Sequence, residues 1–294
     1  MLLKTVKLNK IYGEKVAVKD VSFELSQTGV YLLAGPNGSG KTTLMEMLVQ
    51  MIRPSSGQLI YHQSLSGKDF KRKVGILLQQ NSVRKHVTVA EEVRFVSRIF
   101  KRKLDLESYL RKFDLYEHRH QKCHKLSGGL QRRLLIATTL IPNYELIFFD
   151  EPASGLDVQT RDFIWSIIKE QGAKKICLVS DHYLNQAASY CDQLLLMSQG
   201  ELVFQGAVSK LLSQFKFSTR IQVKSQFASQ TKEILLANHQ EFEELVSGGF
   251  TNYFVKENFN AITNNLLAIS ENVRRVNVED VYLALAREQE GKDV

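Results

Sequence analysis

A glycine-rich segment between an apolar run and a helical stretch has the composition of a phosphate-binding loop. It contains Gly35, Pro36, Asn37, Gly38, Ser39, Gly40, Lys41, Thr42 and Thr43. Glycines in this spacing let successive backbone N–H groups wrap around anionic oxygens at the N-terminus of a helix. We expect Lys41 to reach the β and γ phosphates of a nucleotide and Thr42 to hold Mg²⁺. A loop that serves only as a turn fits less well, because the flanking strand and helix are those that a phosphate site requires.

Two carboxylates follow a second apolar run. Residues 146–149 are Leu, Ile, Phe and Phe, and Asp150 and Glu151 come directly after them. Four apolar residues indicate a buried strand, and open α/β sheets bind ligands at the carboxyl ends of their strands. Asp150 suits the Mg²⁺ shell, usually through water, because Mg²⁺ keeps much of its hydration. Glu151 is expected to orient and deprotonate the attacking water. Such a run is a weak signal alone, since it often only marks a strand end.

A third segment places two glycines directly after a serine. It contains Leu126, Ser127, Gly128, Gly129 and Leu130, and Gln131 follows. Ser127 is expected to cap a helix, so the two glycines lie where exposed N–H groups can meet a phosphate. A helix cap alone would explain the serine but not both glycines.

The elements that position these residues alternate along the chain. Residues 30–34, 146–149 and 176–179 are apolar and indicate buried strands, whereas residues 41–52 and the segment around Phe163 have helical spacing. Strands that alternate with helices predict a mostly parallel sheet and an α/β fold. Half-exposed strands are expected between residues 2 and 25, with a turn at Tyr12-Gly13, and a hairpin is expected around 194–204. A polar helical subdomain is expected at about 80–140.

The chain after residue 214 becomes less apolar and carries no phosphate-binding motif. We expect a domain at 1–214 and a small C-terminal α+β domain at 215–294. Within the second, residues 221–224 and 252–256 are expected to be strands, and residues 231–237 and 259–268 helices.

Composition excludes several classes of protein. The 294 residues are 44% hydrophobic and 24% charged, which is typical of a globular protein of one large and one smaller domain. No stretch approaches the ~20 apolar residues of a membrane-crossing helix, and the first residues lack a secretory signal, so a cytoplasmic location is expected. Three cysteines without paired spacing argue against a disulfide framework or a zinc site. The net charge of +8 does not choose among nucleic acid, an anionic membrane and simple solubility.

Taken together, these motifs resemble those of the ATP-binding cassette (ABC) family, over roughly residues 2–206. The resemblance assigns roles to further residues. Tyr12 is similar to the aromatic residue that stacks on adenine, and Gln79 to the glutamine that senses Mg²⁺ and contacts the membrane subunit. His182 resembles the histidine that contacts the γ-phosphate. One further segment is similar to the loop that bridges two protomers, and it contains Ser154, Gly155, Leu156 and Asp157.

The resemblance implies a P-loop nucleotide-binding domain with a parallel core sheet, an antiparallel β subdomain and a helical subdomain. ATP and Mg²⁺ are the implied cofactors. Each ATP would lie between the phosphate loop of one copy and residues 126–130 of another, in a homodimer or in a heterodimer with a second ABC subunit. Two helix N-termini facing one γ-phosphate neutralise it better than one. The partner would be an integral membrane permease, at the cytoplasmic face of the cell membrane.

One departure from the family's pattern and one further resemblance refine this expectation. The fifth residue of the serine-glycine segment is usually Gln in the family and is Leu130 here, so we expect altered packing rather than lost hydrolysis. Residues 278–285, which read Val-Glu-Asp-Val-Tyr-Leu-Ala-Leu, resemble the terminal helix of subunits that work with ABC-2 exporters. Export of a drug, an antibiotic, a peptide or a lipid-linked molecule is therefore expected. An amphipathic helix that packs its own domain is the simpler reading of that motif.

Other interpretations compete with the exporter ATPase. A cassette ATPase acting on nucleic acid is disfavoured, because such proteins usually carry two cassettes or a long coiled coil before the serine-glycine segment. An importer ATPase stays open. A clamp that binds ATP without hydrolysis is disfavoured by Glu151 and His182. A metal site is suggested by His118, His120, Cys123 and His124, but their spacing matches no recognised ligand set, and a solvated surface fits better.

Overall fold

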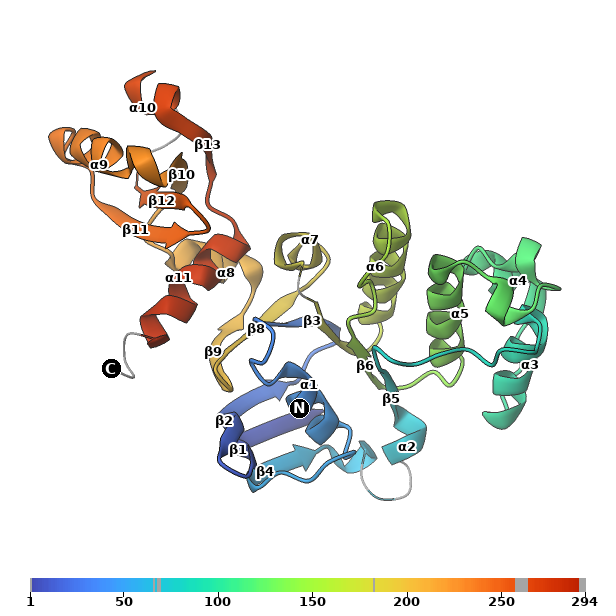
Figure 1. Cartoon of the computed structure of the whole chain (residues 1–294). Helices are drawn as coiled ribbons and strands as arrows, with labels where there is room; N and C mark the ends of the chain where they lie inside the picture. Colours follow the sequence, from blue (N-terminus) through green and yellow to red (C-terminus); the bar gives the residue numbers. More distant parts are fainter. Residues whose placement is uncertain (1, 66, 68–69, 182, 257–263, 291–294) are drawn as a thin grey trace. The chain divides into compact units, whose positions relative to one another are not determined.

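The computed structural model describes residues 2–65, 67, 70–181, 183–256 and 264–290 (Figure 1). The chain forms two compact units, Met1–Gln205 and Gly206–Val294, which are described separately below. The boundary expected from composition, between residues 214 and 215, falls at the end of helix α8 (Val208–Gln214) of the second unit. In the described part of the chain, no helix has both the length and the apolar character needed to cross a membrane.

An antiparallel sheet of three strands begins the first unit. Its order is β2 (Lys15–Leu25), β1 (Leu3–Tyr12) and β4 (Ser56–Tyr61). Leu3 pairs with Leu25 and Tyr12 with Lys15, so the expected turn after Tyr12 closes a long hairpin. Gly13 has a positive φ of 58°, a conformation that glycine adopts without strain.

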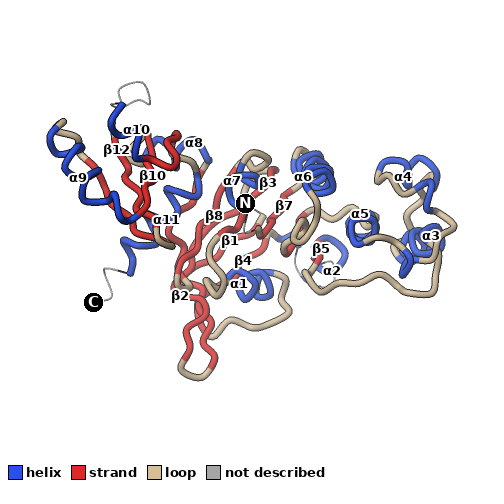
Figure 2. The backbone as a smooth tube through the Cα atoms, turned by 45° about the horizontal axis from the view of Figure 1, so that its top comes forward, coloured by secondary structure: helices blue, strands red, loops and turns tan. Residues whose placement is uncertain are grey.

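The core of the first unit is a six-stranded sheet, as the alternation of strands and helices predicts (Figure 2). Four of its five pairings, which join the first five strands of its order, are parallel. Its order is β5 (Val74–Leu77), β6 (Leu146–Asp150), β7 (Ile176–Ser180), β3 (Gly29–Ala34), β8 (Gln193–Ser198) and β9 (Glu201–Gly206). Every residue of β3, β6 and β7 is buried, which explains their continuous apolar sequences.

Helices cover the parallel sheet. Helix α1 (Lys41–Leu48) packs Leu44, Met45 and Leu48 into one hydrophobic core with residues from both sheets of the unit. Helix α6 (Val158–Gly172) contacts β3 and β7, and α7 (Leu184–Ala188) contacts β3. The phosphate loop and the carboxylates therefore lie at the carboxyl ends of buried, well-supported strands.

The polar insert at about residues 80–140 is helical, as its sequence predicts. It contains α3 (Val89–Ile99), α4 (Leu106–Lys112), η3 (Tyr116–His118), η4 (Cys123–Lys125) and α5 (Gly128–Leu140). Two short helices before β5, η1 (Gln63–Leu65) and α2 (Phe70–Lys73), lie outside the insert. Helix α3 begins with a capping box, in which Thr88 and Glu91 each accept the other's backbone N–H. Asp105 caps α4 by accepting the backbone N–H of Ser108, so short polar side chains set the start of both helices.

The second unit is built on an antiparallel sheet of order β11 (Phe242–Ser247), β12 (Phe250–Val255), β10 (Thr219–Lys224) and β13 (Ser270–Arg275). Its other elements are η5 (Ser225–Phe227), α8, α9 (Ala228–Ala237), α10 (Asn264–Ile269) and α11 (Val278–Glu290). Sequence analysis predicted β10, β12 and α9 but missed β11 and β13. The helix expected at 259–268 is described only from Asn264, and residues 257–263 lie outside the described part of the chain.

A charged cluster fixes α11 to this sheet. Asp280 is completely buried and accepts hydrogen bonds from Arg220 of β10 at 2.9 Å and Arg274 of β13 at 2.6 Å. Asp280 and Asn277 also exchange backbone-to-side-chain bonds at the start of the helix. The motif at residues 278–285 is thus the first part of a helix anchored by one carboxylate.

Candidate functional site

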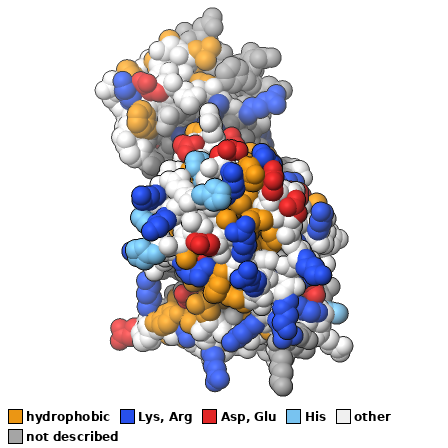
Figure 3. All heavy atoms as spheres, turned by 90° about the vertical axis from the view of Figure 1, so that its right-hand side faces the viewer, with side chains coloured by type: hydrophobic (Ala, Val, Ile, Leu, Met, Phe, Trp, Pro, Cys, Tyr) orange, Lys and Arg blue, Asp and Glu red, His pale blue; other side chains and the backbone are white. Residues whose placement is uncertain are grey.

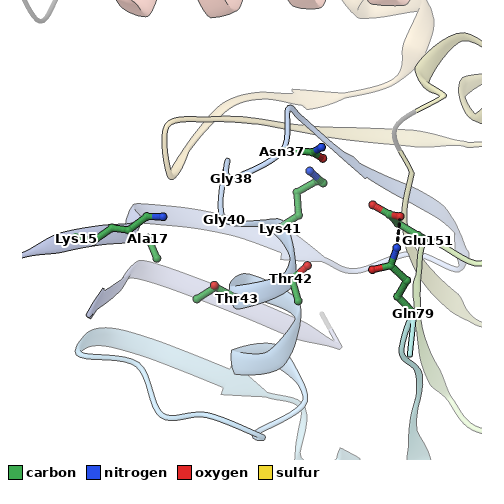
Figure 4. Close-up of a pocket in the computed structure, with 10 residues that line it drawn as sticks. All are labelled: Lys15, Ala17, Asn37, Gly38, Gly40, Lys41, Thr42, Thr43, Gln79 and Glu151. Atoms are coloured by element: carbon green, nitrogen blue, oxygen red, sulfur yellow. Dashed lines mark hydrogen bonds between the residues drawn. The ribbon is translucent and has the colours of Figure 1, made fainter. Parts of the chain in front are cut away.

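The glycine-rich segment forms a loop between β3 and α1 (Figure 4). Gly40 has a φ of 97°, and a Cβ placed on it would lie 2.3 Å from the carbonyl oxygen of Ala17. Only glycine fits this position, because both the backbone conformation and the neighbouring strand exclude a side chain. Lys41 is 7% exposed, and its Nζ donates to the carbonyl oxygens of Gly35 at 2.8 Å and Pro36 at 2.9 Å.

Lys41 is a buried cation facing acidic residues. Burial lowers the pKa of its ammonium group, and the negative charges of Glu151 and Asp150 partly oppose this effect. A nucleotide phosphate would add negative charge beside the same ammonium group and favour its protonated form. The loop is therefore electrostatically prepared for an anion.

The two carboxylates at the end of β6 differ in their surroundings. Asp150 is 6% exposed, and its Oδ1 accepts a hydrogen bond from Ser180 Oγ at 2.6 Å. Ser180 Oγ in turn accepts from the backbone N–H of Glu151 at 2.9 Å. Glu151 has a φ of 46°, a left-handed conformation that costs a non-glycine residue about 1–3 kcal/mol. Its Oε2 accepts a hydrogen bond from Gln79 Nε2 at 2.9 Å, so β5 and β6 deliver these two side chains together.

A cavity of about 500 Å³ joins the loop to these side chains. Figure 4 shows Glu151 and Gln79 facing Lys41 and Thr42 across it. The described residues that line it are Lys15, Ala17, Asn37, Gly38, Gly40, Lys41, Thr42, Thr43, Gln79 and Glu151. Sequence analysis missed Lys15 and Ala17. Their signal in the sequence was a position just after the Tyr12-Gly13 turn, in a strand whose Ala17 carbonyl oxygen lies against Gly40 of the loop.

The serine-glycine segment lies outside this cavity. Ser127 caps α5, its Oγ accepting from the backbone N–H of Leu130 at 3.3 Å, as its sequence predicts. Ser127 and Gly128 are exposed, and Gly129 and Leu130 are half-buried. Gly128 has open space around the position of a Cβ, whereas a Cβ on Gly129 would lie 3.2 Å from the Thr160 side chain. Leu126 is buried beneath the turn.

The other predicted residues that the structure describes also lie outside the cavity lining. Tyr12 is 48% exposed at the end of β1, and Asp157 caps α6 by accepting from the Thr160 N–H at 2.9 Å. Hydrogen bonding to that N–H lowers the pKa of the Asp157 carboxyl. Gly155 is exposed, and Ser154 and Leu156 are half-buried. His182 lies outside the described residues.

Comparison with known proteins gives the family. The family model described as ABC transporter matches residues 18–154. The Nod factor export ATP-binding protein I of Burkholderia orbicola (strain AU 1054) is 31% identical over 218 residues, which cover 70% of each chain. This chain belongs to the ABC transporter ATP-binding family. It is therefore an ABC ATPase that binds ATP.

Other members and solved structures agree with this family. The linearmycin resistance ATP-binding protein LnrL of Bacillus subtilis (strain 168) is 29% identical, over 76% of this chain and 74% of LnrL. The human glucosylceramide transporter ABCA12 is 31% identical over 66% of this chain, which spans only 8% of that protein. The fold matches an ATP-binding subunit of an ABC transporter, with a TM-score of 0.64 and 23% identity over 73% of this chain and 93% of that chain.

Proposed function

We propose that this chain powers an exporter, hydrolysing Mg-ATP between two cassettes to drive a substrate through separate membrane subunits at the cytoplasmic face of the cell membrane. The observation that carries the proposal is the cavity that brings Lys41, Thr42, Gln79 and Glu151 together from three elements. A drug, an antibiotic, a peptide or a lipid-linked molecule is the proposed class of substrate. Names of relatives that act in Nod factor export and linearmycin resistance support it.

The residues at and around the cavity that could act on a nucleotide have proposed roles. The phosphate loop, residues 35–43, holds the β and γ phosphates, and Glu151 accepts a proton from the attacking water, which Gln79 helps to orient. Thr42, Asp150 and Gln79 present only oxygen donors and an amide, the set that suits Mg²⁺ rather than a softer metal. When bound, Mg²⁺ would offset charge on the phosphates. His182 is proposed to contact the γ-phosphate.

The exposed serine-glycine turn supports a dimer. Ser127 and Gly128 present the N-terminus of α5 to solvent, and neither lines the cavity of its own chain. A second cassette that offers this turn to the γ-phosphate would complete the site with further N–H donors. Tyr12 is proposed to stack on adenine, and residues 154–157 are proposed to bridge the two cassettes.

A face of the helical insert supports a membrane partner. Figure 3 shows hydrophobic side chains among lysines and arginines on the side of the unit that carries α3 and α4. On α3, Phe95 is 44% exposed and Ile99 56% exposed, beside the exposed Arg94 and Arg98. Apolar side chains rimmed by polar ones are typical of protein contacts. A cavity of about 220 Å³ lies between α3, α5 and the segment after β5, close in sequence to Gln79. We propose that the permease binds at this exposed face of α3 and the adjacent cavity.

Residues 215–294 are proposed to form an accessory domain.

Co-purification tests the proposal against the nucleic-acid alternative. The full-length chain, expressed with a candidate permease, is expected to form a stable complex whose ATPase activity depends on Lys41. Binding of the chain to RNA or DNA in a salt-dependent manner, with no membrane protein retained, would favour a nucleic-acid function instead. In inside-out membrane vesicles that contain the complex, accumulation of substrate inside the vesicles on addition of external ATP would support export. Release of preloaded substrate would indicate import.

A further inference from the structure

The peptide of Glu151 is held from both sides by side chains that lie outside the cavity. Its N–H donates to Ser180 Oγ at 2.9 Å. On the other side, the guanidinium of Arg132 donates from Nη2 to the carbonyl oxygen of Glu151 at 2.9 Å. The same Nη2 lies 3.2 Å from the carbonyl oxygen of Asp150, and Nε lies 2.7 Å from that of Pro152. One planar fork therefore satisfies three consecutive carbonyl oxygens.

These contacts act where the backbone is least stable by itself. Glu151 has a φ of 46°, although it is not glycine, and such a conformation persists only when neighbouring contacts enforce it. The backbone conformation also sets the direction of the side chain, because the Cβ of a residue in a continuing strand would point differently. In Figure 4 the carboxylate of Glu151 faces Lys41 and Gln79 in this conformation. Loss of the fork would release the constraint that aims it.

We infer that Arg132 is a positioning residue for ATP hydrolysis, which holds Glu151 in its left-handed conformation through three backbone carbonyl oxygens. The inference rests on the proposed role of Glu151 as the base. Arg132 is not among the described residues that line the cavity, so it acts through Glu151 and not on the nucleotide. It also stands in α5, the helix that Ser127 caps. The turn offered to a second cassette and the base of the chain's own site are thus joined by one helix.

Substitution of Arg132 separates positioning from binding. In the full-length chain, R132Q is expected to lower kcat about 10- to 100-fold, because a catalytic group misplaced by about 1 Å can lose ~10²-fold in rate. The dissociation constant for a non-hydrolysable ATP analogue, measured by calorimetry, is expected to change less than about twofold, since the phosphate loop is untouched. R132K is expected to recover part of kcat, because an ammonium can serve one or two of the three oxygens but not the whole fork.

The neighbouring arginine supplies the control. Arg133 stands on the same helix, but its guanidinium pairs with Asp114 and lies over the ring of Phe163 at 4.3 Å. R133Q should therefore keep kcat within about twofold of wild type, even if its melting temperature falls as much as that of R132Q. A wild-type kcat in R132Q would overturn the inference. It would also be overturned if R132Q and R133Q lost the same amount of kcat and the same amount of affinity for the analogue. A wild-type chain that hydrolyses no ATP would refute the proposed hydrolysis itself, independently of Arg132.

Discussion

Removal of the charge of Asp280 should lower the free energy of unfolding of the C-terminal unit, and the contacts of this residue indicate by how much. Replacing the residue by asparagine leaves Arg220 and Arg274 without their common carboxylate, and three side-chain hydrogen bonds of 2.6 to 3.0 Å are lost or weakened. Breaking one partner of a buried ion pair costs about 3–5 kcal/mol. The arginine side chains are 20% and 30% exposed and can regain some hydration, so the lower end, about 3 kcal/mol, applies.

Hydrogen exchange measures this loss locally. A cost of about 3 kcal/mol corresponds to an approximately 10²-fold faster exchange for the protected amides of β10 and β13, while amides of β6 and β7 in the first unit serve as internal reference. E271Q is the matched control, because Glu271 pairs with Lys224 at 3.1 Å on the surface, where both side chains are about half exposed. That pair is worth at most about 1 kcal/mol. Protection in D280N equal to that in E271Q would show that the buried carboxylate does not hold α11.

Two further predictions concern the nucleotide site. E151Q should keep ATP binding and lower kcat by about 10²–10⁴-fold, because glutamine preserves the contact with Gln79 but cannot accept the proton. The control E145Q, at the other end of β6, should hydrolyse ATP normally. Equal rates in E151Q and wild type, measured with the membrane partner, would show that the assigned base is wrong. The affinity for ATP should fall as pH rises through the lowered pKa of Lys41, below the 10.5 of an ordinary lysine, because the neutral amine loses its attraction for phosphate. Calorimetric titration of K41R, whose guanidinium stays charged, should show no such fall, and a parallel fall in both proteins would exclude Lys41 as the cause.

The predictable parts of the fold are those whose sequence carries local chemistry. Residues 146–150 form a strand because every side chain in it is apolar up to the aspartate, and Ser127 caps a helix because its hydroxyl accepts the N–H of Leu130. The strands β11 and β13 were missed for the opposite reason. They read Phe-Glu-Glu-Leu-Val-Ser and Ser-Glu-Asn-Val-Arg-Arg, which carry few apolar residues and no regular alternation. The backbone of β13 gains its partner from β10, which is distant in sequence, whereas β11 pairs with the adjacent β12 across the turn at Gly248 and Gly249.

The candidate site divides along the same line. The sequence by itself determined which residues carry chemistry, since the glycine loop, Lys41 and the pair Asp150-Glu151 declare their types and spacing. It could not determine that β2 brings Lys15 and Ala17 to the loop, that Glu151 is left-handed, or that Arg132 braces it. Those facts arise from contacts between segments far apart in the chain, whose energies exist only when the sheet and helices have packed, whereas a phosphate loop or a helix cap is a property of a few adjacent residues.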